Sequence, residues 1–268
     1  MVNVTLPRIR LGHLAISRLI AGGNPISGFS HQNAERSRQM LEYFTVEQIK
    51  EHWRTCEEHG INALIARADA FIMRVLAEYW REGGHIRWIA QTAPEHRDPF
   101  ANIRQAHQVG ASAIFLHGGE IDRLFAQGEI EEIRTRVEFV RSLGVPVGMA
   151  AHEPCNHLEA QALGFPLDFH LVCMYNLTGY QGRREEPSGE PFNFADRAIA
   201  LDTLQKLNRP CIAYKVMGAG RLGMPEALAD VGQALRPTDG VLIGMFPPDR
   251  PNIVAENVRA VASLPFHG

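Results

Sequence analysis

The sequence has little of what marks membrane, secreted or zinc-binding proteins. Its four cysteines, Cys56, Cys155, Cys173 and Cys211, are scattered and form no CxxC pair, so neither a disulfide framework nor a structural zinc site is indicated. No apolar run approaches the roughly 20 residues that cross a bilayer, and the opening MVNVTLPRIR lacks the apolar core of a signal peptide. We therefore expect free thiols, no membrane partner and a cytoplasmic protein.

The sequence also has almost no excess of charge of one sign. The 268 residues carry a formal net charge of −3, and the sequence pI is about 6.5. No stripe of lysine and arginine is present, which argues against a nucleic-acid partner and leaves a small-molecule substrate as the expectation. Because no linker divides the chain, we expect one domain over residues 1–268; homo-oligomerisation stays open.

One apolar stretch indicates where the active side of the fold lies. Residues 111–122, ASAIFLHGGEID, are rich in Ile and Phe and run into two glycines, which is typical of a strand buried on both faces. This places His117 at the C-terminal end of the strand. In a barrel of parallel strands that end faces the active site.

The same pattern recurs along the chain and alternates with helical stretches. A β-hairpin is predicted over residues 6–19, and a first barrel strand over residues 17–23. Further strands are predicted at 63–66, 86–90, 113–117, 145–151, 169–174, 211–216 and 240–245. Helices are predicted at 45–58, 70–82, 99–109, 130–143, 157–163, 195–207, 225–235 and 253–264. Eight β/α units in about 250 residues predict a (β/α)8 TIM barrel with an N-terminal β-hairpin. An open doubly wound sheet is the alternative, but GxGxxG does not follow the first strand.

Two polar stretches are too long for ordinary connections. They span residues 26–44, after the first strand, and residues 177–194, after the sixth. Both follow the C-terminal end of a strand. We expect them to fold over the mouth of the barrel and cover a site.

Six fragments occur in an order typical of one family of barrels. They are LGHLAISRLIAGG, HGINALIARAD, AIFLHGG, LVCMYNL, CIAYKVMGAGRLG and VLIGMFPPDRPNIVAENVRAV. Together they resemble the aldo-keto reductases, NADP(H)-using barrels that open with a β-hairpin. The resemblance covers nearly the whole chain and implies an aldo-keto-reductase-like fold.

The resemblance does not extend to most of the family's catalytic groups. The family uses an Asp, a Tyr, a Lys and a His, and only His117 matches. The Asp position falls at Ile65, the Tyr position near Asp69 and the Lys position at residues 91–93. The ordinary tetrad mechanism is therefore not expected.

The implied cofactor site is also only partly matched. The family's Ser-Asn pair falls on Ala150 and Ala151, and its sixth-strand Gln falls near Val172, so no side chain hydrogen-bonds the nicotinamide. Tyr214 matches the tyrosine that stacks on the ring, and Asn257 matches the adenine-side asparagine. NADP(H) is therefore the alternative cofactor, and we expect it to bind far more weakly than micromolar.

Polar residues gather at the predicted strand ends. His117 and His152 end consecutive strands, so we expect them to bind one divalent metal ion. A third protein ligand is also expected, and several residues are candidates for it. The alternative is that both are hydrogen-bonded rim residues without a metal. The candidates for the third ligand are Asp69, Glu153, Cys173 and His31. The expected substrate-binding residues are Asn24, Arg67, Gln91, Asn176, Tyr214 and Arg221.

Lys215 is a further candidate within an apolar strand. A partly buried lysine has a lowered pKa and can act as a base or form a Schiff base with a carbonyl substrate. The alternative is that strand alternation points Lys215 outward, toward a salt bridge. The expected catalytic residues are His117, Lys215, Asp69 and Glu153.

These patterns lead to one main functional expectation and two alternatives. The main one is a barrel enzyme doing metal-assisted, redox-neutral chemistry on a small polyol or carbonyl substrate, of isomerase, epimerase, lyase or hydrolase type. The first alternative is an NADP(H)-dependent oxidoreductase with a rearranged proton donor. The second is a ligand-binding barrel without catalysis.

Overall fold

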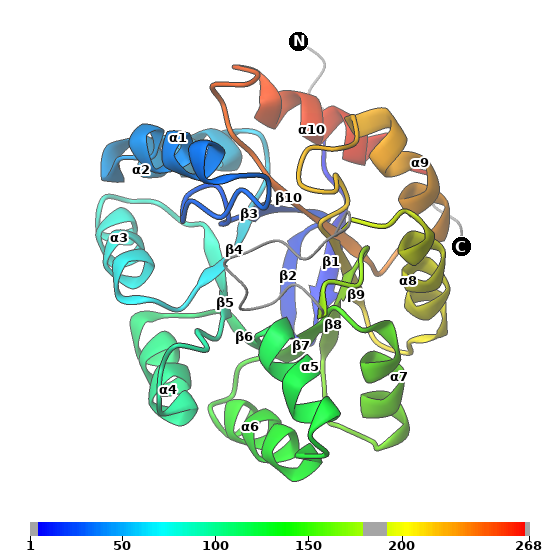
Figure 1. Ribbon diagram of the computed structural model, residues 1–268. Helices are drawn as coiled ribbons and strands as arrows, with labels where there is room; N and C mark the ends of the chain where they lie inside the picture. Colours follow the sequence, from blue (N-terminus) through cyan, green and yellow to red (C-terminus); the bar gives the residue numbers. More distant parts are fainter. Residues whose placement is uncertain (1–4, 179–191, 266–268) are drawn as a thin grey trace.

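Eight parallel strands close into a barrel ringed by helices in the computed structural model, which describes residues 5–178 and 192–265 (Figure 1). The barrel strands are β3 Leu19–Gly22, β4 Ala63–Arg67, β5 Arg87–Gln91, β6 Ala113–Leu116, β7 Val147–Ala151, β8 Phe169–Cys173, β9 Cys211–Tyr214 and β10 Gly240–Gly244. Their closed order is β10-β3-β4-β5-β6-β7-β8-β9. Strands β1 Arg8–Leu11 and β2 Leu14–Ser17 form an antiparallel hairpin. The predicted (β/α)8 barrel with its N-terminal hairpin is confirmed.

The barrel strands are buried on both faces, as their apolar runs predict. On the inner face, Ile65, Phe115 and Leu171 pack into one cluster with Ile16 of the hairpin. The hairpin therefore closes the N-terminal end of the barrel. On the outer face, side chains such as Val172 pack in a second cluster with the surrounding helices. This arrangement leaves the C-terminal ends of the strands as the open side.

The outer helices follow the strands in the predicted order. They are α2 Val46–Glu58, α3 Ala70–Arg81, α4 Pro99–Val109, α6 Ile130–Ser142, α7 Pro154–Ala162, α8 Ala195–Lys206, α9 Met224–Ala234 and α10 Ile253–Ala262. Helix α2 begins as predicted, because Thr45 Oγ1 accepts a hydrogen bond from the backbone N–H of Gln48 at 3.3 Å. Among the described helices, none has the length and apolar composition needed to cross a bilayer.

Two helices lie outside the predicted set, α1 Ala34–Tyr43 and α5 Gly118–Ala126. Helix α1 lies within the first long polar stretch and is capped by Asn33. Helix α5 starts at the two glycines that follow β6 and His117, where no helix was predicted. Its buried Ile121 and Leu124 explain why it forms, since they bury an apolar face despite the glycines.

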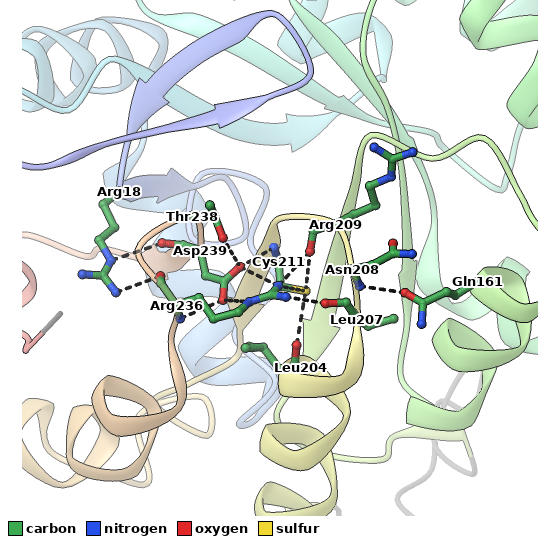
Figure 2. A network of polar contacts seen from close by, with 10 residues as sticks. All are labelled: Arg18, Gln161, Leu204, Leu207, Asn208, Arg209, Cys211, Arg236, Thr238 and Asp239. Atoms are coloured by element: carbon green, nitrogen blue, oxygen red, sulfur yellow. Dashed lines mark hydrogen bonds and ion pairs between the residues drawn. The ribbon is translucent and has the colours of Figure 1, made fainter. Parts of the chain in front are cut away.

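A polar network fixes the N-terminal ends of β9 and β10 (Figure 2). The buried Asp239 carboxylate accepts hydrogen bonds from Cys211 N–H at 2.8 Å and from Arg236 Nε at 2.8 Å. Arg18, just before β3, donates from Nε to the Asp239 carbonyl at 3.1 Å. The Arg236 guanidinium also binds the carbonyls of Leu207 and Arg209. This network lies opposite the open end, where residues of a barrel serve stability.

Candidate active site

A cavity of about 780 Å³ opens at the C-terminal ends of the strands. Its inner wall is apolar and includes Ile65, Phe115 and Leu171. Its polar side chains from the strand ends are Asn24, Arg67, Gln91, His117, His152, Tyr214 and Lys215. The cavity continues outward between α1 and α10, as far as Asn257. A site of this size, apolar with a few converging polar groups, suits a small organic molecule.

The first long polar stretch covers this cavity, as predicted. Phe29, His31 and Gln32 line it together with the strand ends. Gln32 Nε2 donates to the carbonyl of Ala219 at 2.7 Å, which ties the stretch to the loop after β9. Of the second stretch, residues 179–191 lie outside the described residues; Leu177 lines the cavity.

His152 is held by a carboxylate from the unpredicted helix α5. Asp122 Oδ2 accepts a hydrogen bond from His152 Nδ1 at 2.9 Å, and the same carboxylate accepts from the backbone N–H of His152 at 3.0 Å. Asn156 Nδ2 donates to Asp122 Oδ1 at 2.9 Å. Burial lowers the pKa of His152, and Asp122 opposes that effect. The imidazole is therefore oriented with its Nδ1 proton toward Asp122.

His117 is the N-cap residue of α5 and faces the same cavity. Its backbone N–H donates to Thr92 Oγ1 at 2.9 Å, while its Nδ1 is buried without a hydrogen-bond partner among the described residues. Burial, with nearby positive charge on His152 and Arg67, lowers the pKa of His117 to about 4. His117 is therefore neutral at pH 7 and can accept or donate a proton.

Gly118 allows the start of α5 to lie close to His152 and Tyr214. A Cβ at this position would lie 3.0 Å from His152 Cε1 and 3.3 Å from the Tyr214 hydroxyl. The ring of Tyr214 meets that of His152 edge to face, with centroids 5.9 Å apart. Any side chain at position 118 would push α5 away from His152 and Tyr214.

Lys215 lines the cavity because its backbone departs from the strand. Strand β9 ends at Tyr214, two residues earlier than predicted, and Lys215 adopts a left-handed φ of 58°. Tyr214 and Lys215 are consecutive, yet both side chains face the cavity. The alternative that alternation points Lys215 outward is therefore wrong. A left-handed conformation is costly for a residue with a Cβ and is concentrated at functional sites.

His31 from the first polar stretch meets Lys215. Lys215 Nζ lies 3.0 Å from His31 Nε2, and Asn24 Nδ2 lies 3.2 Å from the same nitrogen. Both neighbours are donors, so Nε2 is the acceptor and the ring proton sits on Nδ1. The charge of Lys215, followed by burial, lowers the pKa of His31 to about 3. Burial lowers the pKa of Lys215.

Two expected catalytic carboxylates lie outside the cavity lining. Asp69 caps α3, where Oδ1 accepts from Ile72 N–H at 2.9 Å, and its other oxygen lies 3.6 Å from Arg67 Nε. Glu153 precedes α7, and its Oε2 accepts from Asn176 Nδ2 at 2.6 Å. Both carboxylates are engaged in holding local structure. Their expected catalytic roles are not supported by these positions.

Two expected substrate-binding residues also lie outside the lining. Asn176 binds Glu153 and, through its backbone N–H, Asp196 at 2.9 Å. Arg221 donates to the His31 carbonyl at 3.4 Å, and its guanidinium lies 4.3 Å from the centre of the Phe192 ring. They support the loops around the cavity. Asn24, Arg67, Gln91 and Tyr214 line it, as expected of substrate-binding residues.

The described residues do not form a complete site for a metal ion. Within residues 5–178 and 192–265, no group of three His, Cys, Asp or Glu side chains is arranged to hold a metal. Catalytic zinc sites typically use three protein ligands. His117 and His152 face one cavity, but Asp69 and Glu153 are engaged elsewhere. His117 and His152 alone are fewer than the three protein ligands of a typical catalytic zinc site.

Two of the three positions that the resemblance assigns to the nicotinamide lie outside the cavity lining. Ala150 lines the cavity as expected, whereas Ala151 and Val172 pack in the outer cluster with the helices. The inward residue beside Val172 is Leu171, which cannot hydrogen-bond a carboxamide either. Asn257 is 1% exposed, and neither its Nδ2 nor its Oδ1 has a partner among the described residues. A buried amide without partners is costly unless a ligand satisfies it.

Comparisons with known proteins identify the fold. No family model and no curated protein matches the sequence. The structure is similar to a candidate aldo-keto reductase from Pseudomonas aeruginosa, with a TM-score of 0.64 and 15% identity over 98% of each chain. It is also similar to a candidate 2,5-diketo-D-gluconic acid reductase B, with a TM-score of 0.60 and 12% identity over 99% of this chain and 89% of the other.

A third similar structure is named as a synthetase and not as a reductase. It is an N-acetylneuraminic acid synthetase from Leptospira borgpetersenii serovar Hardjo-bovis, with a TM-score of 0.57 and 12% identity over 97% of this chain and 89% of the other. At such identities the similarity shows the fold alone. The resemblance to the aldo-keto reductases is thus confirmed at the level of fold.

Asp122 was not among the expected catalytic and binding residues, and His31 was expected only as a candidate metal ligand. Asp122 lies in a segment for which no helix was predicted, so the sequence did not indicate that its carboxylate would contact His152. His31 lies in a long polar stretch, where spacing carries no information about contacts. The only sequence feature that pointed to these contacts was the number of histidines at the strand ends and in this polar stretch.

Proposed function

We propose that this protein is an enzyme that carries out redox-neutral acid–base chemistry on a small polyol or carbonyl compound. The observation that carries the proposal is the convergence of His117, His152 and Lys215 on one partly apolar cavity. Lowered pKa values keep His117 neutral at pH 7 and favour neutral His152 and Lys215. A neutral imidazole or amine can accept a proton, so each of these groups is available as a base in the cavity.

The arrangement suits removal and return of a proton beside a carbonyl group. Asp122 orients the imidazole of His152, which supports a role for His152 as the base that takes a proton from carbon. Lys215 or His117 then donates a hydrogen bond or proton to the oxygen on which negative charge develops. Returning the proton to the other face, or to the neighbouring carbon, gives an epimer or an isomer. The same base starts the cleavage catalysed by a lyase.

Proton exchange into heavy water tests this proposal without knowledge of the natural substrate. Glycolaldehyde, dihydroxyacetone and glyceraldehyde would be incubated with the protein in D2O, and loss of the α-proton signal followed by NMR. We expect catalysed exchange with at least one probe, and a loss of about 100-fold in His117→Gln and His152→Gln. The control is His85→Gln, at an exposed position. Failure of the wild-type protein to exchange any probe would contradict the proposal.

Metal assistance is a variant of the same proposal. Two histidines facing one cavity would need substrate oxygens to complete the coordination of a divalent ion. Elemental analysis of the wild type, His117→Ala and His152→Ala tests it. Retained metal that both substitutions remove, together with activity lost in chelator, would favour the metal-assisted form. A metal-free protein that exchanges protons in chelator would favour the acid–base form.

NADP(H)-dependent reduction is the second candidate function. It is favoured by Asn257 at the outer end of the cavity, whose buried amide has no hydrogen-bond partner among the described residues, and by Tyr214, which lines the inner end. It is opposed by the apolar Ala150 and Leu171, which cannot hold a carboxamide. A fluorescence titration with NADPH distinguishes the two candidates.

A further inference from the structure

Lysine is rare in this protein, and the three lysines lie in different surroundings. The sequence has 24 arginines but only Lys50, Lys206 and Lys215. Lys50 is buried, and its Nζ lies 2.8 Å from Glu78 and 2.6 Å from Glu82. Lys206 is exposed and pairs with Asp202 one helical turn away. In both places the lysine serves as a cation in a salt bridge.

Lys215 differs because no described carboxylate forms a salt bridge with it. The titratable groups around it are His31 at 3.0 Å, the Tyr214 ring with its centre 5.8 Å from Nζ, the Cys173 thiol, and the imidazoles of His117 and His152. Burial raises the pKa of Cys173 to about 11, so the thiol is uncharged at pH 7. All these neighbours are thus neutral or cationic, and none stabilises an ammonium as a carboxylate would.

The choice of lysine over arginine is informative at this position. Arginine supplies almost all the positive charge of the chain and cannot be deprotonated in a protein. Lysine can become a neutral amine when it is buried without an anionic partner, and a neutral amine is a nucleophile. The left-handed backbone at Lys215 carries this amine into the cavity at a cost in strain. A merely electrostatic role would not require lysine.

We propose that Lys215 is a nucleophile that forms an imine with an aldehyde or ketone carbon of the substrate. This inference rests on the proposed function and names its substrate class, a carbonyl compound. It also gives His31 a role, that of exchanging protons with Lys215 through Nε2. The imine adds a covalent step to the acid–base chemistry of the same cavity.

The step balances without an additional reactant. The Lys215 ammonium passes a proton to His31 Nε2, and the amine attacks the carbonyl carbon. A C–N bond forms while the C=O π electrons move to oxygen, and His31 relays protons to give a neutral carbinolamine. The hydroxyl group then leaves as water after taking a proton from His31. In sum, one ammonium and one carbonyl give one protonated imine and one water, and His31 ends neutral.

The imine explains how the site would acidify a C–H bond without a metal. A protonated imine withdraws electrons more strongly than a carbonyl does, so the neighbouring carbon loses a proton to His152 and an enamine forms. Reprotonation and hydrolysis by one water release the product and regenerate Lys215. The apolar wall formed by Phe115 and Leu171 protects the intermediate from premature hydrolysis.

Reductive trapping tests the inference directly. The protein would be treated at pH 7 with glycolaldehyde, dihydroxyacetone or glyoxylate in the presence of sodium cyanoborohydride, which reduces an imine to a stable amine. Intact mass and peptide mapping then locate the adduct, with Lys50 and Lys206 as controls within the same chain. We expect Lys215 to react at least about tenfold faster than Lys206, because each unit by which its pKa falls raises the neutral amine about tenfold.

Substitutions distinguish the loss of a nucleophilic amine from the loss of the fold. Lys215→Arg keeps the positive charge and should lose the adduct, as should Lys215→Met, whereas Lys206→Arg should keep it. His31→Asn retains a residue that tolerates the left-handed φ of 54° but removes the imidazole. It should slow labelling of Lys215 without changing that of Lys206. Thermal unfolding of each variant confirms that the fold is intact.

Trapping and proton exchange distinguish this inference from the proposed function. No adduct at Lys215, or labelling no faster than at Lys206, would overturn the imine, and exchange that continues would then leave the acid–base function standing. An adduct at Lys215 without α-proton exchange by any probe would support the imine and overturn the acid–base function. Absence of both would overturn both.

Discussion

The carboxylate of Asp122 holds His152 at two places, its ring Nδ1 at 2.9 Å and its backbone N–H at 3.0 Å. Asp122 lies on α5 and His152 directly after β7, so the pair joins an additional helix to the end of a barrel strand. Asn156 of α7 donates to the same carboxylate at 2.9 Å. One buried carboxylate thus orients the imidazole and fixes two helices around the cavity.

Asp122→Asn should weaken both the fold and the site. An amide group in place of one oxygen would face donors at His152 and Asn156, so about 1–3 kcal/mol of unfolding free energy should be lost. The pKa of His152 should fall further, because Asp122 is the group that raises it against burial. Chemical denaturation and an NMR titration of the histidines measure the two effects. The control is Asp202→Asn, in an exposed ion pair; an unchanged His152 titration would contradict the orienting role.

The buried pair His157 and His170 should make the protein sensitive to acid. Their Nδ1 atoms lie 3.1 Å apart, and burial lowers the pKa of His157 to about 4 and that of His170 well below its usual value. In the unfolded chain histidine titrates near 6.5. Below that pH the unfolded chain binds protons that the folded pair does not, so stability is complete above pH 6.5 and is lost as the pH falls toward 4.

Thermal unfolding between pH 7 and pH 4 measures this effect. We expect His170→Gln to reduce the fall in Tm over that range by at least about 3 °C, since one kcal/mol shifts Tm by roughly 2–4 °C in a protein of this size. His85→Gln, at an exposed position, is the matched control. Equal slopes for the wild type and His170→Gln would show that the pair does not cause acid sensitivity.

The network at the N-terminal end should contribute to stability and leave the chemistry unchanged. Asp239→Asn would replace one of the two acceptor oxygens by an NH2 donor and leave a partly buried guanidinium without its charge partner. Loss of one member of a buried pair costs about 3 kcal/mol. Denaturant unfolding should show this loss, while labelling of Lys215 by cyanoborohydride trapping should proceed at the wild-type rate in the folded variant. A changed labelling rate would mean that the two ends of the barrel are coupled.

NADPH should bind far more weakly than micromolar. The inner end of the cavity presents Ala150 and Leu171 where a carboxamide would need partners, although Asn257 remains at the outer end. A fluorescence titration measures the dissociation constant. Tight stoichiometric binding that Asn257→Ala weakens would instead establish the oxidoreductase, whereas tight binding unchanged in Asn257→Ala would place the nucleotide elsewhere.

The order of the barrel strands follows from local patterns. The stretch ending in His117 is apolar enough to be buried on both faces, and the same holds for seven further strands, so composition and spacing alone predict a closed barrel. The sequence likewise places His117 and His152 at the open end, because parallel strands all end on the same side. These conclusions need only local periodicity and the direction of the chain.

The contacts inside the site depend on tertiary structure. Strand alternation points Lys215 outward, but a left-handed backbone at that residue, stabilised by the contact of its amine with His31, turns it into the cavity. Asp69 and Glu153 lie two residues after β4 and β7, near the predicted strand ends, yet helix capping and Asn176 engage their carboxylates. Asp122 reaches His152 only because an apolar face holds α5 in place. The sequence by itself determined which residues reach the open end of the barrel; which of them meet was decided by packing between segments far apart in the chain, which no local pattern records.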